Sequence, residues 1–165
     1  MITFDERGHL VESYELNLIQ FKELFVDKWQ PNMSTRPNIF DVFEKYIVDF
    51  KTMITPDFIM WVDGSFVTKK GNPRDIDFVS FIDYTAYFKE VKLIDNQFGK
   101  YGTKNHYGLL LDGYVSPIYP QQHEEAFTTQ SNEAYWRSQF SYTKPDKHLK
   151  KYSKGFIKIK FTGNE

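Results

Sequence analysis

Cysteine is absent from this chain of 165 residues. Its absence excludes disulfides, thiolate zinc sites and a cysteine nucleophile, and it fits a reducing compartment. No apolar run approaches the roughly 18 residues that suggest a membrane span. The first residues, Met1 to Leu10, carry charges where a secretory signal would have an apolar stretch. We therefore expect a cytoplasmic protein that makes no membrane contact.

Excess positive charge is also lacking, because the formal net charge is −1. A chain of this charge offers no general field for a phosphate backbone, which argues against generic DNA binding. The basic residues are nevertheless uneven: seven lysines and a single acid, Asp146, lie between Lys144 and Lys160. This segment is either a solvated C-terminal face or a contact surface for a charged partner.

Two common site signatures are missing as well. The four histidines, His9, His106, His123 and His148, lack the close spacing of a zinc site. No Gly-rich loop that ends in Lys and Ser or Thr is present.

The length and the hydrophobic pattern predict one α/β domain, of the α+β kind, with a small mixed central sheet flanked by helices. We divide residues 1–165 into an N-terminal helical part (1–55), a core that holds the candidate site (56–118), and a C-terminal helix with an edge strand (119–165). Aromatic residues make up 18% of the chain and supply much of the apolar area of its core.

Helical spacing and capping residues predict helices, and apolar runs or alternation predict strands. Asn17 with Gln20 and the later Asp83 are the expected N-caps. The helix after Pro120 should bury Ala126, Phe127, Ala134, Tyr135 and Phe140. The predicted helices cover about 17–30, 39–53, 83–98 and 121–140. The predicted strands cover about 58–62, 75–82, 106–111 and 156–161; the third ends in Asp112-Gly113 or continues through Tyr114-Val115.

Two aspartates, Asp75 and Asp77, are separated by one residue within a predicted strand. Side chains alternate along a strand, so both carboxylates share one face, within about 7 Å of each other. Like charges that close repel unless a cation lies between them. Mg²⁺ or Mn²⁺ would relieve that repulsion and could also bridge the phosphates of a nucleotide.

A second motif precedes this pair. Gly64 and Ser65 follow the buried run 58–62, where that strand stops. Glycine lets the backbone approach a ligand closely, and Ser65 offers a hydroxyl and a main-chain N–H to phosphate oxygens. Gly64-Ser65 followed by Asp75-Ile76-Asp77-Phe78 therefore predicts a phosphate cradle that faces a metal pair.

The stretch from Trp61 to Val79 resembles the signature of the DNA polymerase β-like nucleotidyltransferase superfamily. The shared pattern is a hydrophobic residue, Gly, Gly or Ser, a spacer, and then Asp, a hydrophobic residue, Asp or Glu and a hydrophobic residue. Scattered positions, including Tyr135-Trp136 and Lys154-Gly155-Phe156, are similar to a small stand-alone bacterial branch of that superfamily.

The resemblance implies roles for individual residues. Gly64 and Ser65 would hold the triphosphate, and Asp75 and Asp77 would bind metal. A third acid is expected from a neighbouring strand: Asp112 is preferred, and Asp95 competes with it from within a helical pattern. Lys69, Lys70 and Arg74 lie in the spacer, either as phosphate contacts or as solvated loop charges.

The implied activity is transfer of a nucleoside monophosphate from a nucleoside triphosphate to a hydroxyl of a protein, an RNA or a small molecule, with two Mg²⁺ or Mn²⁺ ions. Small members of the superfamily often act in toxin–antitoxin or phage-defence pairs. The alternative is an inactive nucleotide-binding or protein-interaction module on the same fold.

Overall fold

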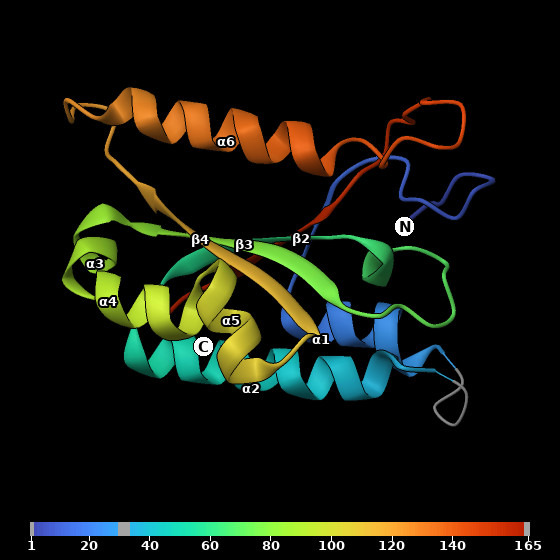
Figure 1. Cartoon of the computed structure of the whole chain (residues 1–165), viewed down its shortest axis with the longest axis horizontal. Coiled ribbons are helices and arrows are strands. Elements are labelled where there is room, and N and C mark those ends of the chain that lie inside the picture. The colour runs from blue at the N-terminus through green and yellow to red at the C-terminus, as the bar shows by residue number, and fades with distance from the viewer. Residues whose placement is uncertain (1, 30–33, 164–165) are drawn as a thin grey trace.

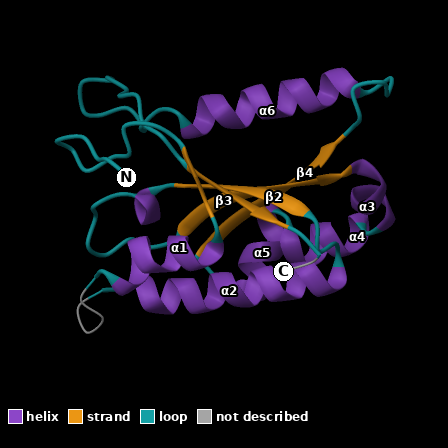
Figure 2. Ribbon diagram, turned by 180° about the vertical axis from the view of Figure 1, so that it is seen from behind, coloured by secondary structure: helices purple, strands orange, loops and turns teal. Residues whose placement is uncertain are grey.

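The computed structural model describes residues 2–29 and 34–163 and shows one mixed sheet between two layers of helix (Figures 1 and 2). Helix α6 covers one face of the sheet, and α1, α2 and α5 cover the other. This arrangement confirms the predicted α/β class. None of the helices in the described ranges is both long and apolar enough to cross a bilayer.

The sheet has five strands in the order β1-β5-β2-β3-β4. β2 is antiparallel to β3 and to β5, whereas β3 and β4 run parallel, as do β1 and β5. The strands are β1 (Tyr14–Leu16), β2 (Phe58–Asp63), β3 (Ile76–Asp83), β4 (Leu111–Ile118) and β5 (Ile157–Phe161).

The helices partly follow the predicted pattern. The Asn17–Gln20 capping box opens α1, and the side chain of Asp83 caps α3. The helices are α1 (Leu18–Lys22), α2 (Arg36–Met53), α3 (Tyr84–Lys89), α4 (Val91–Leu93), α5 (Lys100–Tyr107) and α6 (Ala126–Phe140), with π-helical turns at Glu23–Asp27 and Ile94–Phe98. The predicted end of the first helix near Gln30 lies outside the described residues.

The third predicted strand begins too early, although the part from Leu111 through Val115 is confirmed. Residues Lys100–Tyr107 form α5, and β4 begins only at Leu111. Gly102 lets α5 pack against the preceding π-helical turn, since an added Cβ would lie 2.4 Å from backbone atoms of Asn96 and Gln97. Gly108, at φ 82°, then ends the helix in a conformation that side chains disfavour.

The last two elements also differ from the prediction. β5 is internal rather than an edge strand, because the short β1 pairs with its free side. In α6, Phe140 is buried, but Phe127 and Tyr135 are exposed. The helix instead contacts the sheet through Trp136, whose ring lies 4.7 Å from that of Tyr114. A helix that covers only part of a sheet buries a narrow stripe, which periodicity alone does not locate.

The main core lies between the sheet and α2. It is rich in phenylalanine: Phe43 packs edge-on against Phe78 of β3 at 5.2 Å, and Phe21 stacks on Phe66 at 5.9 Å. Aromatic pairs at these separations add to the stability gained from buried area alone. A smaller cluster on the other face joins Trp61, Val79 and Phe81 to α6 through Phe140.

Arg36 ties the loop after β2 to this core. Its side chain is fully buried, and its guanidinium donates hydrogen bonds to the carbonyls of Phe25, Phe66, Thr68 and Lys70. Burial lowers the pKa of Arg36 to about 10, so that the group stays charged at neutral pH. One side chain therefore fixes the segment that follows Gly64 and Ser65.

Replacing Arg36 tests how much its hydrogen bonds to the buried carbonyls stabilise the fold. Arg36→Met leaves buried carbonyls without donors, and we expect a loss of about 3 kcal/mol or more in the free energy of unfolding. Arg36→Lys should recover only part of that loss, because a single ammonium cannot reach as many carbonyls as the guanidinium fork. Urea denaturation measures both, with Glu44→Ala, an exposed position on the same helix, as control. If Arg36→Met lowered the free energy of unfolding no more than Glu44→Ala does, Arg36 would not hold this loop against the core.

Candidate functional site

Three aspartates lie side by side across the sheet. Strand register pairs Asp63 of β2 with Asp77 of β3, and Asp77 with Asp112 of β4. Residues paired in this way direct their side chains to the same face of a sheet. That face carries Trp61, Val79 and Phe81 and is the one beneath α6. Asp75 directly precedes β3 and extends the acidic row, which we call the aspartate row (Asp63, Asp75, Asp77, Asp112).

Local sequence explains why these acids can crowd together. All three lie at the same end of the sheet: Asp63 is the last residue of β2, and Asp77 and Asp112 are the second residues of β3 and β4, which run antiparallel to β2. The neighbours Val62, Phe78 and Gly113 face the α2 core; Gly113 is needed there because an added Cβ would lie 2.5 Å from the Phe78 ring. The apolar side of each strand thus anchors the acidic side.

Asp77 is the central and least compensated member of the row. Burial, together with the negative charges of Asp75, Asp63 and Asp112, raises the pKa of Asp77 to about 6. Only Lys144 opposes them. Among the described residues, Asp77 forms no ion pair, so its negative charge has no cation in contact.

The flanking acids do have cations. Lys154, which precedes β5, forms an ion pair with Asp63 in which both side chains are 9% exposed. Burial raises the pKa of Asp63, and the Lys154 ammonium opposes that shift. On the other side, Lys104 of α5 places its Nζ 3.3 Å from Oδ1 of Asp112. That Oδ1 is buried and has no hydrogen-bond partner, so the contact with Lys104 is an ion pair without the alignment of a hydrogen bond.

Gly64 lies directly against Asp77. Its φ is 79°, and a Cβ added there would stand 1.9 Å from Oδ2 of Asp77. Ser65 follows at the start of a single 3₁₀ turn, Ser65–Val67. The motif predicted as a phosphate cradle is therefore in contact with the central acid, and the close backbone approach that requires glycine is made to Asp77.

The spacer cations are less directly placed. Lys69 is exposed, and its Nζ lies 5.4 Å from the centre of the Phe4 ring, while its backbone N–H donates to the carbonyl of Gly8. Arg74 is exposed and next to Asp75. The structure brings Asp75, Asp77, Asp112, Gly64 and Ser65 together, whereas Lys69 faces the N-terminal turn. The competing acid, Asp95, lies exposed in the π-helical turn Ile94–Phe98, outside the row.

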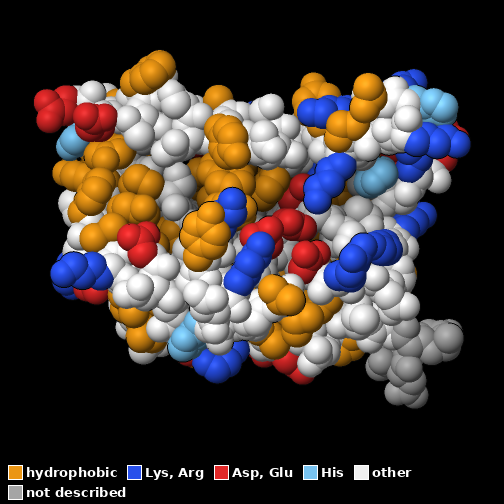
Figure 3. Space-filling model, viewed as in Figure 1, with side chains coloured by type: hydrophobic (Ala, Val, Ile, Leu, Met, Phe, Trp, Pro, Cys, Tyr) orange, Lys and Arg blue, Asp and Glu red, His pale blue; other side chains and the backbone are white. Residues whose placement is uncertain are grey.

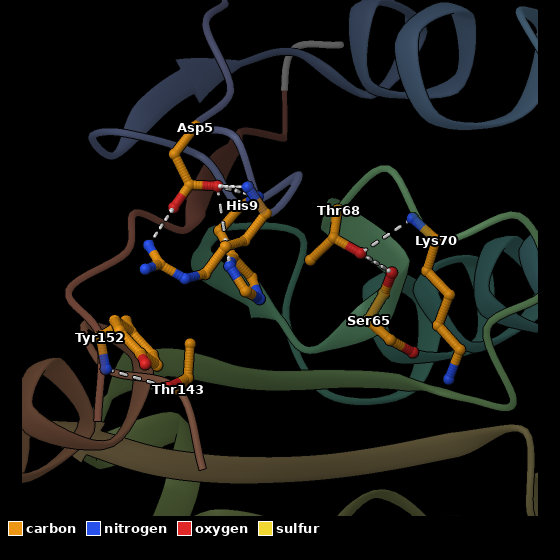
Figure 4. A network of polar contacts seen from close by, with 8 residues as sticks. Asp5, His9, Ser65, Thr68, Lys70, Thr143 and Tyr152 are labelled. Atoms are coloured by element: carbon orange, nitrogen blue, oxygen red, sulfur yellow. Dashed lines mark hydrogen bonds and ion pairs between the residues drawn. The ribbon is translucent and has the colours of Figure 1, made fainter. Parts of the chain in front are cut away.

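Three segments distant in sequence form the rim on the Gly64 side (Figure 4). The N-terminal turn is held by Asp5, which accepts backbone hydrogen bonds from Arg7 and His9. The 3₁₀ turn is closed by Thr68, whose hydroxyl donates to the carbonyl of Ser65. A C-terminal loop contributes Tyr152, whose N–H donates to the Thr143 hydroxyl. His9 also lowers the pKa of Asp63 through its charge.

Charge of both signs meets at this site. Figure 3 shows acidic side chains gathered below α6, with lysine and arginine side chains on either side of them. Sequence reasoning missed Lys104, Lys144 and Lys154 as site residues. The basic segment from Lys144 to Lys160 was visible in the sequence, but its contact with Asp63 spans 91 positions, which no local pattern reveals.

Carboxylate oxygens are hard ligands of the kind Mg²⁺ and Mn²⁺ prefer. Asp77, which has no ion pair among the described residues, and Asp112, whose buried Oδ1 is paired with Lys104 but accepts no hydrogen bond, are the candidate ligands. In the described ranges, however, no three His, Asp or Glu side chains already stand in a metal-holding group. Two of the four acids, Asp112 and Asp63, are instead paired with Lys104 and Lys154.

A family model described as a family of unknown function (DUF6932) matches residues 2–160. No curated protein and no solved structure matches the chain significantly.

Substitution at Gly64 tests its contact with Asp77. Gly64→Ala should destabilise the protein by roughly 2 kcal/mol or more, because it adds both a left-handed backbone penalty and a collision with the carboxylate. Gly71→Ala is the matched control, since a Cβ there meets nothing within 4 Å. If the two residues are in contact, Gly64→Ala should cost less in an Asp77→Ala background than in the wild type. Thermal unfolding of both single variants and the double variant measures this; an equal cost in both backgrounds would contradict the contact.

The pKa of Asp77 predicts how stability depends on pH. A carboxyl whose folded-state pKa is raised stabilises the fold fully below its unfolded value, near 3.8, and this contribution is lost as pH rises through about 6. Asp77→Asn removes the charge, so it should raise the free energy of unfolding by roughly 1 to 3 kcal/mol at pH 7.5. The gain should vanish near pH 4. An equal effect at both pH values would show that Asp77 is not the titrating group.

Proposed function

The chain belongs to this family of unknown function, and we propose that it is a metal-dependent nucleotidyltransferase whose site is the aspartate row with Gly64 and Ser65. The observation that carries the proposal is Asp77: a half-buried carboxylate against Gly64, with three further acids around it and a pKa raised to about 6. Such a group is costly to bury as an anion unless a cation joins it during function.

In the proposed reaction, each group of site residues has a distinct role. Asp75, Asp77 and Asp112 would hold Mg²⁺ or Mn²⁺, which supplies charge neutralisation on the phosphates when bound. Gly64 and Ser65 would offer backbone N–H groups and a hydroxyl to the triphosphate. Lys104 and Lys144 lie at the row and could meet further phosphate charge, and Lys69 and Arg74 belong to the spacer beside it.

The reaction follows from this arrangement. An acceptor hydroxyl forms a bond to the α-phosphorus of a nucleoside triphosphate, the bond to the β-phosphate oxygen breaks, and pyrophosphate leaves. Asp112 is well placed to accept or orient the proton of the hydroxyl, since it neighbours Asp77 in the sheet and keeps one buried oxygen without a hydrogen-bond partner. The acceptor is a protein, an RNA or a small molecule in the cytoplasm. In a toxin–antitoxin or phage-defence system, the acceptor would be a partner molecule of that system.

One observation favours a second function. Lys154 and Lys104 already neutralise two of the four acids, which is the arrangement expected of a module that has lost its metal and binds nucleotide or protein without turnover. Binding of a triphosphate without transfer would select this alternative.

A transfer assay tests the proposal. The purified protein is incubated with each α-labelled triphosphate, Mg²⁺ or Mn²⁺, and cell lysate as a source of acceptor. We expect label on one acceptor class, and a loss of about a hundredfold or more in Asp77→Asn, since the central acid cannot be replaced by an amide.

Asp95→Asn is the matched control for this assay. It removes an exposed acid outside the row and should retain full transfer. Label transfer that survives Asp77→Asn, or that falls equally in both variants, would contradict the assigned site.

A further inference from the structure

A cavity lies on the same face of the sheet as the aspartate row, toward the opposite ends of the strands. It encloses about 480 Å³ between α6 and the far ends of the strands, a size in the range of small-molecule sites. Phe81, on its floor, is four residues beyond Asp77 along β3, or roughly 13 Å at the usual strand rise. The cavity is thus separate from the site described above.

The floor of this cavity is apolar and partly aromatic. It is made by Ile59 and Trp61 of β2, Phe81 of β3 and Ile118 of β4. Ile59 and Phe81 are partners in the strand register, and the rings of Trp61 and Phe81 lie 4.8 Å apart. Ile59 is 37% exposed. The Trp61 and Phe81 rings are tilted by 59° and are only 5% and 3% exposed, so Ile59, with the small exposed parts of both rings, forms the apolar floor against which a ring can pack.

The walls carry unpaired positive charge. Arg137 of α6 and Lys158 and Lys160 of β5 line the cavity. The Arg137 guanidinium lies 5.3 Å and the Lys158 ammonium 5.7 Å from the Trp61 ring. Within the described ranges, none of these three cations forms an ion pair. Positive charge from a helix and from a strand therefore lies close to one aromatic residue. An anionic group of a ligand would neutralise that charge.

The cavity also contains hydrogen-bond acceptors. Glu15 of β1 and Glu133 of α6 face it alongside the cations. Carboxylates next to unpaired cations suit a ligand that combines an anionic group with hydroxyl or amino donors. A bare anion would be repelled by them, and a purely apolar ligand would leave all of these charges unsatisfied.

We propose that this cavity binds a nucleoside monophosphate, with the base on the floor of Ile59, Phe81 and Trp61, the phosphate at Arg137, Lys158 and Lys160, and amino or hydroxyl groups at Glu15 and Glu133. The base matches the apolar floor, the phosphate matches the three cations, and the amino or hydroxyl groups match the two carboxylates. The site contains no acid of the aspartate row, so binding needs no divalent ion. The inference is independent of the proposed transfer reaction.

Calorimetric titration in EDTA tests the proposal on the full chain. AMP, GMP, CMP and UMP are the probes. Adenosine is the control without a phosphate, and inorganic phosphate is the control without a nucleoside. We expect at least one monophosphate to bind with a dissociation constant below millimolar, and both controls to bind at least tenfold more weakly, because neither engages both floor and cations.

Substitutions of cavity residues test where the nucleoside monophosphate binds. Arg137→Gln and Lys158→Gln should each weaken it about tenfold, the usual effect of a lost charge-assisted contact. Arg137 is exposed on α6 and Lys158 half-buried on β5, so both variants should fold, which thermal unfolding verifies. Lys151→Gln, an exposed lysine outside the cavity, and Asp77→Asn should bind as the wild type does.

Three results would overturn the inference. They are the absence of binding by all four monophosphates at millimolar concentration, equal binding of inorganic phosphate, and binding that Asp77→Asn abolishes while Arg137→Gln leaves it intact. The last would place the nucleotide at the aspartate row. A lost transfer reaction with intact binding in EDTA would reject the proposed function and leave this site standing.

Discussion

The aspartates at one end of the sheet repel one another, and the protein must offset that repulsion whenever Asp77 is ionised. Strand register makes the crowding unavoidable, since Asp63, Asp77 and Asp112 are direct neighbours across three strands. Lys154 and Lys104 compensate the outer two, and Gly64 approaches the central one so closely that no side chain could replace its hydrogen. Under the proposed function, the remaining charge on Asp77 is the one that a bound cation would neutralise.

Distant parts of the chain hold this end of the sheet in place. Arg36 of α2 binds the carbonyls of the loop after β2 from the core side. Lys154 reaches Asp63 from the C-terminal side, next to Gly155, where an added Cβ would collide with the backbone of Glu12. The loops that carry the candidate phosphate-binding residues are therefore fixed by buried charged groups, whose hydrogen bonds are costly to break because their partners would remain buried.

Local sequence signals predicted much of this arrangement. The Asn17 and Asp83 caps, β2 and β3 follow from capping chemistry and apolar patterns, whereas Asp75 precedes β3 rather than lying in it. Asp112 lies beside Asp77 as predicted although its strand begins later than expected, because α5 ends at Gly108 and β4, which starts at Leu111, still includes Asp112. The lysine partners, the internal position of β5 and the buried stripe of α6 depend on contacts between residues far apart in sequence, which periodicity does not encode.

The ionisation of Asp77 is the most direct test of this account, and carboxyl ¹³C NMR measures it in the folded protein. The aspartate row predicts a pKa near 6 for Asp77 without divalent ions, and a clear decrease when Mg²⁺ or Mg²⁺ with a nucleoside triphosphate is added, because a bound cation favours the carboxylate. Assignment by comparison with Asp77→Asn identifies the resonance. A pKa near 4 that neither addition changes would contradict the claim that Asp77 is held for a cation.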